Sequence, residues 1–130
     1  MDAQQALADL TEISSQIEAA VLFDDQGGVA GSTLAGDEAA RALATAAGRL
    51  LEEAAALHPG GGEVTQLEAS TQEGSVFVVR DGERRIAATT GPSPTVGLVF
   101  YDLKSCLRGT DAAKPKRRAP RKKEPAGGEA

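Results

Sequence analysis

The sequence predicts an α+β domain with a five-stranded antiparallel sheet, helices on both faces and the element order α-β-β-α-β-β-β-α. Three observations lead to this fold class. Apolar residues recur at helical spacing in some segments, they alternate with polar residues in others, and turns rich in glycine or proline separate the segments. The 130 residues are 41% hydrophobic and 25% charged, which fits one globular domain. Because only 3% are aromatic, we expect a core of aliphatic and alanine side chains.

The predicted helices cover residues 3–15, 37–57 and 95–108, and the predicted strands cover residues 17–23, 28–32, 63–71, 75–80 and 84–90. In the first helix, Leu7 and Leu10 recur at helical spacing. From Ile17 the period changes to two, which indicates a strand. Gly27-Gly28 then turns the chain into a short returning strand, because glycine adopts a positive φ without steric cost.

The longest helix begins at Asp37 and Glu38, whose charges complement the positive end of the helix dipole, and it ends before Pro59. Its apolar residues form two adjacent surfaces, together wider than one core contact needs. The surface predicted to pack on the sheet is Leu43, Ala46, Ala47, Leu50, Ala54 and Leu57. The surface left for a second copy of the chain is Ala40, Ala44, Gly48, Leu51 and Ala55. A helix rich in alanine for its helix propensity alone is the alternative.

Three strands and a helix complete the domain. The strand over residues 63–71 carries Leu67 on one face, and we expect this strand to join the dimer interface. Asp81-Gly82 predicts a tight hairpin between the last two strands, with a type I′ turn. The final helix is amphipathic, and Gly109 is predicted to end it.

Charge divides the chain in two. Residues 1–110 carry 7 basic and 16 acidic side chains, whereas residues 111–130 carry 7 basic and 3 acidic ones. The end of the chain contains no Leu, Ile, Val or aromatic residue, so it cannot bury enough surface to offset the entropy of ordering. We therefore predict a domain over residues 1–109 and a disordered basic tail over residues 110–130. The basic residues of the tail are Lys114, Lys116, Arg117, Arg118, Arg121, Lys122 and Lys123.

No catalytic, cofactor-binding or metal-binding constellation is predicted. One Cys and one His exclude a multi-cysteine or two-histidine metal site, and no phosphate-binding loop motif is present. Cys106 is interpreted as a partly buried small hydrophobe, His58 as a surface residue at a helix end, and Gly60-Gly61-Gly62 as a flexible connection. No apolar run reaches the ~20 residues of a membrane span, and the N-terminus lacks the features of a signal peptide. We expect a cytoplasmic protein.

The order of these elements and several local sequences resemble the roadblock / dynein light-chain family. The matching segments are residues 7–10 and 17–24, the glycine-turned hairpin up to Ser32, the alanine-rich helix, residues 74–79 and residues 96–103. The resemblance covers roughly residues 3–108.

This resemblance implies a homodimer in which the long helices pack together and the third strands pair edge to edge. It also implies a platform for Ras-like small GTPases, in some bacterial members one that stimulates hydrolysis without a catalytic constellation of its own. Bacterial relatives often accompany signalling proteins that resemble histidine kinases. The alanine-rich composition and the tail suit a high-GC bacterium.

Several functions remain open at this point. The first is a regulator or scaffold for a small GTPase, and the second is a purely structural dimerisation module in a signalling assembly. The tail offers a third, the attachment to an anionic membrane surface, a nucleic acid or an acidic protein patch, with an intramolecular contact or a merely solubilising tail as alternatives. An enzyme or a small-ligand sensor is disfavoured, because no convergent polar groups are found.

Overall fold

The computed structural model describes residues 2–57, 60 and 62–113. The helices are α1 (Ala3–Ile13), α2 (Asp37–Ala55) and α3 (Val96–Ala113). The strands are β1 (Ile17–Asp24), β2 (Val29–Ser32), β3 (Gln66–Thr71), β4 (Gly74–Asp81) and β5 (Arg84–Thr90). The predicted element order is thus confirmed. The tail residues from Lys114 on, with His58, Pro59 and Gly61, lie outside the described residues.

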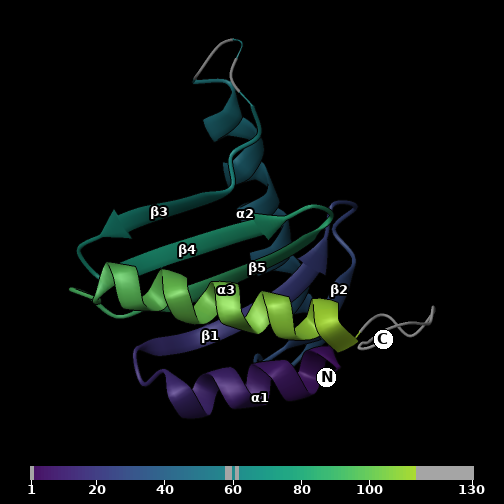
Figure 1. The fold of residues 1–130 in the computed structure, drawn as a ribbon. Helices are drawn as coiled ribbons and strands as arrows, with labels where there is room; N and C mark the ends of the chain where they lie inside the picture. Colours follow the sequence, from purple (N-terminus) through teal and green to yellow (C-terminus); the bar gives the residue numbers. More distant parts are fainter. Residues whose placement is uncertain (1, 58–59, 61, 114–130) are drawn as a thin grey trace, which may run out of the picture.

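All five strands form one antiparallel sheet in the order β2-β1-β5-β4-β3. Helices α1 and α3 lie side by side on one face, and α2 covers part of the other (Figure 1). Strands β2 and β3 are therefore the two edges of the sheet. The predicted fold class, with helices on both faces, is confirmed.

Each face of the sheet has its own aliphatic core. Beneath α1 and α3 the largest buried side chains include Leu7, Phe77 and Leu103. Beneath α2 the core is smaller, since alanines of the helix contact Val21 and Val78 of the sheet. The short alanine side chains bring the axis of α2 close to the strands, as expected for a chain that is poor in aromatic residues.

Two local predictions differ from the structure. The β4–β5 hairpin has the two-residue loop Gly82-Glu83, since Asp81 already pairs with Arg84, and only Gly82 has a positive φ, of 65°. One positive φ, at the first loop residue, is the pattern of a type II′ turn, so the predicted type I′ turn is wrong. The last helix also continues through Gly109 to Ala113, because a glycine lowers helix propensity without forcing an end.

Candidate self-association surface

Helix α2 packs on the sheet mainly through the apolar surface that was predicted for the dimer, together with Ala47 of the surface predicted to face the sheet. Ala40, Ala44 and Leu51 are only 2%, 1% and 2% exposed, and with Ala47 they belong to the core on this face of the sheet. Ala40, Ala44 and Leu51, which the sequence predicts for the dimer interface, instead belong to the core between α2 and the sheet. Small side chains allow a helix to pack closely on a sheet, and they equally allow two helices to pack closely together. The spacing of the alanines alone therefore cannot distinguish a core contact from a dimer contact.

The other apolar surface of α2 is open. We call it the open flank, and it consists of Ala39, Leu43, Ala46, Leu50, Ala54 and, in the turn after the helix, Leu57. Ala46 and Leu57 are exposed, whereas Leu43 and Leu50 are half-buried. The remaining flank of the helix is polar and faces β2 and the β1–β2 turn, where Arg41, Thr45 and Arg49 line two shallow cavities. The open flank lies on the other side of the helix, and its Leu43 packs against the same core as Leu67 and Val76 of the sheet.

The sheet contributes a second apolar wall beside the open flank. Leu67 and Ala69 of β3 pair with Val78 and Val76 of β4, so all four side chains lie on the face that carries α2. Helix α2 packs mainly on β1, β2 and β5. Leu67, Ala69 and Val76 therefore remain half-buried at the margin of the core. Leu67, predicted from the sequence for the dimer interface, lies on this wall.

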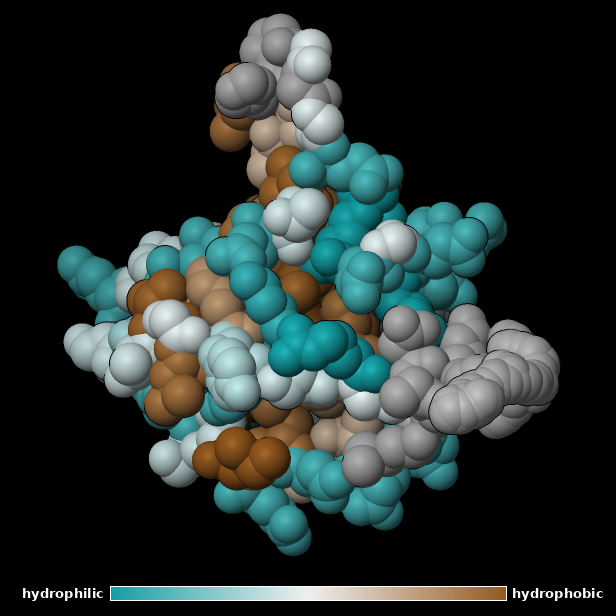
Figure 2. All heavy atoms as spheres, in the orientation of Figure 1, coloured by the Kyte–Doolittle hydropathy of each residue, from teal (hydrophilic) through white to brown (hydrophobic). Residues whose placement is uncertain are grey.

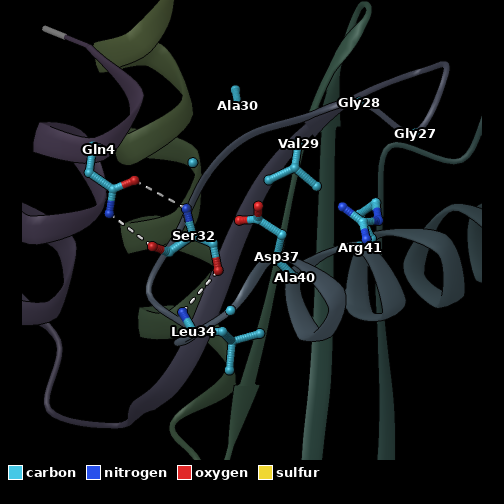
Figure 3. A pocket seen from close by; sticks show the side chains of 12 residues that line it. Gln4, Gly27, Gly28, Val29, Ala30, Ser32, Leu34, Asp37, Ala40 and Arg41 are labelled. Atoms are coloured by element: carbon cyan, nitrogen blue, oxygen red, sulfur yellow. Dashed lines mark hydrogen bonds between the residues drawn. The ribbon is translucent and has the colours of Figure 1, made fainter.

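The two edges of the sheet are treated differently. At β2, the Gln4 side chain donates from Nε2 to the Ser32 carbonyl oxygen at 2.8 Å and accepts from the Ser32 backbone N–H at 3.4 Å (Figure 3). This amide occupies the backbone groups that another strand would need at that position. Edge strand β3 has β4 as its one neighbour in the sheet. An open strand edge next to an apolar helix flank is the arrangement expected of an interface between two copies of one chain.

Gly48 and Ala55, also predicted for the dimer, are half-buried and line cavities on the polar side of α2. The residues that the sequence missed are Leu43 and Leu50 of the open flank. A signal for them was present: their neighbours in the helical projection are apolar, whereas Gly48 and Ala55 adjoin Arg41, Thr45 and Glu52. A helix surface whose neighbouring residues are apolar can be extended into a larger contact area than one that adjoins charged residues.

The described part of the chain shows no group of three or more His, Cys, Asp or Glu side chains that could hold a metal ion. Burial, with a smaller contribution from the Asp9 carboxylate, raises the pKa of the Cys106 thiol to about 11. A thiol with that pKa is protonated at neutral pH and is a poor nucleophile. Cys106 is buried, somewhat more than the predicted partial burial. Among the described residues, no helix is long and apolar enough to cross a membrane.

No family model matches the sequence, and no curated protein matches it. Solved structures do. A Roadblock/LC7 domain from Streptomyces avermitilis superposes with a TM-score of 0.76 at 18% identity, covering 87% of this chain and 98% of that one. The gliding protein MglB from Thermus thermophilus has a TM-score of 0.71 at 14% identity, with 85% and 86% covered. MglB with a tetrameric arrangement gives 0.72 at 14% identity, with 85% of each chain covered.

These similarities establish the fold. The chain has the architecture of Roadblock/LC7 domains over most of its length, and the resemblance seen in its sequence is confirmed at that level.

Proposed function

We propose that this chain, which has the Roadblock/LC7 fold, works as a homodimeric and non-catalytic regulator or scaffold for a Ras-like small GTPase. The observation that carries the proposal is the open apolar surface formed by the open flank of α2 and by Leu67, Ala69 and Val76 beside edge strand β3. The MglB structures, from the same fold and with self-assembly described for one of them, support it.

Dimerisation through this surface places two copies of α2 side by side. The polar flanks of the helices, with Arg41, Thr45 and Arg49, then stay accessible for a partner. Any effect on GTP hydrolysis is of the GTPase-activating type and works by ordering the catalytic groups of the GTPase itself, since this chain provides no reactive constellation among its described residues.

The experiment is a pull-down with a purified Ras-like GTPase, ideally one encoded beside this gene, loaded with GDP or with a non-hydrolysable GTP analogue. We expect stoichiometric retention that depends on the nucleotide, together with a change in the rate of GTP hydrolysis. Arg49→Glu on the polar flank should weaken retention at least severalfold while leaving the dimer intact. Equal retention of GTPase and an unrelated protein would contradict the proposal.

The second candidate is a purely structural dimerisation module in a signalling assembly, for example with histidine-kinase-type proteins. The same open surface favours it, and the two functions differ in the pull-down, because a structural module forms the dimer without retaining a GTPase. Both functions fit a cytoplasmic, bacterial protein. In both, we assign dimerisation to the predicted domain over residues 1–109, extended to the end of α3 at Ala113, and a separate electrostatic role to the rest of the predicted tail, from Lys114 on.

A further inference from the structure

Helices α1 and α3 lie side by side on the face of the sheet opposite α2 (Figure 1). A groove between these two helices lies away from the proposed dimer interface. Its volume is about 340 Å³. Leu10 and Cys106 lie buried at its base, and Ile13 and Tyr101 stand at its rim with 72% and 64% of their surfaces exposed. Figure 2 shows hydrophobic side chains at the surface over the start of α3 and over α1. A groove with such a rim is suited to an extended segment of chain.

Two acidic side chains, Asp9 and Asp102, line the groove. Asp102 lines it with only 7% of its surface exposed, and no hydrogen bond or ion pair joins its side chain to another described residue. Asp9 lines the same groove, and its carboxylate accepts one hydrogen bond, from Gln5 at 3.1 Å. The residues that line the groove thus include two carboxylates and no basic side chain, which favours a cationic occupant.

The chain carries such an occupant next to the groove. Helices α1 and α3 lie side by side and run in opposite directions (Figure 1). The Cys106 thiol donates to the Ala6 carbonyl oxygen at 3.5 Å, and Gly109 lines the groove. The basic tail starts directly after α3. From Ala113 back to Asp102 the distance along the helix is about 16 Å, which about five or six extended residues span. The cations from Arg118 to Lys123 can therefore reach the carboxylates.

We propose that the basic tail folds back into the groove between α1 and α3 of its own chain, with a lysine or arginine on Asp102 and Asp9 and with Tyr101 and Ile13 against the aliphatic and proline parts of the tail. Tethering favours this contact over a separate partner, because a short linker gives an effective concentration of about a millimolar. The proposal does not depend on the proposed GTPase function. Its test is different from the pull-down above.

Tyr101 makes a specific test available, because the chain has one Tyr and no Trp, so tyrosine emission comes from the groove alone. We would measure acrylamide quenching of Tyr101 in the full chain and in a full chain whose seven tail cations are replaced by Gln. At low salt we expect the quenching constant of the natural chain to be lower by about twofold, as a weak tethered contact predicts, and 0.5 M NaCl should abolish the difference.

Asp102→Asn in the full chain should give the same quenching constant as the neutral-tail variant, the chain whose seven tail cations are replaced by Gln. If Asp102→Asn does not fold, Asp9→Asn, at a half-buried position, provides the same comparison. Asp81→Asn, at an exposed position of β4, is the matched control and should quench like the natural chain. Equal quenching of natural and neutral-tail chains at low salt overturns the proposal. So does protection that grows with protein concentration, which would assign the tail to a second copy. Tail-dependent binding to phosphatidylserine vesicles or DNA without any change at Tyr101 would overturn it as well.

Discussion

Glycines show how differently single positions constrain this fold. A Cβ on Gly74, at the start of β4, would clash with the backbone carbonyl oxygen of Thr90 in the neighbouring strand. A Cβ on Gly48, in the middle of α2, would meet nothing within 4 Å. Backbone atoms cannot move aside as a flexible side chain can, so the two glycines should respond in opposite ways to the same substitution.

We expect Gly74→Ala to lower the free energy of unfolding by about 1–3 kcal/mol, the usual cost of forcing extra volume into a packed site. Gly48→Ala should raise it by about 0.5–1 kcal/mol, because alanine is the better helix residue. Urea titrations followed by circular dichroism measure both. If Gly48→Ala instead weakens self-association, Gly48 belongs to a helix–helix contact, as the sequence alone predicted.

Ionisation of the Cys106 thiol should lower the free energy of unfolding of the domain at alkaline pH. Burial and Asp9 raise the pKa of its thiol from 9.0 to about 11, so the unfolded chain loses this proton first as the pH rises. The stabilisation is therefore complete below pH 9 and is lost between pH 9 and pH 11. The urea midpoint of the natural chain should fall more steeply over this interval than that of Cys106→Ala. Parallel pH profiles for the two proteins would contradict the assignment.

At the scale of elements, the sequence predicted every helix and strand, because hydrophobic periodicity reports which residues share a face. It could not decide which of two apolar surfaces of α2 packs inward. Both sets of residues, Ala40, Ala44 and Leu51 and Leu43, Ala46 and Leu50, recur at helical spacing. The choice between them depends on the position of the helix over β1 and β5. That position is set by contacts between residues far apart in the chain.

The burial of Ala44 and Leu51 beneath α2 predicts that a charge at either position unfolds the domain. Leu51→Glu or Ala44→Glu places a charge in the core beneath the helix, which should cost several kcal/mol and unfold the domain at room temperature. Loss of the cooperative urea transition and of the circular dichroism signal would show it. Either variant remaining folded as a stable monomer would restore the original assignment of these residues to the dimer.

At the scale of the whole molecule, the two faces of the sheet have different roles. Helices α1 and α3 close one core and leave a groove between them, whereas α2 leaves the β3 side of the other face open. Of the predicted interface residues, Leu67 alone lies on that open wall, since its strand was identified correctly and the alternation of the strand fixed its face. The Asp102 groove was not predicted, because α1 and α3 lie at opposite ends of the chain.

The most direct test concerns the open flank. Ala46 and Thr45 are adjacent and both exposed in the single chain, but Ala46 lies on the open flank and Thr45 on the polar flank. Light scattering coupled to size exclusion should give the natural chain and Thr45→Glu twice the 13.3 kDa mass of one chain at micromolar concentration, and Ala46→Glu a mass approaching 13.3 kDa. A natural chain that is monomeric, or equal masses for the two variants, would contradict self-association through α2 and β3.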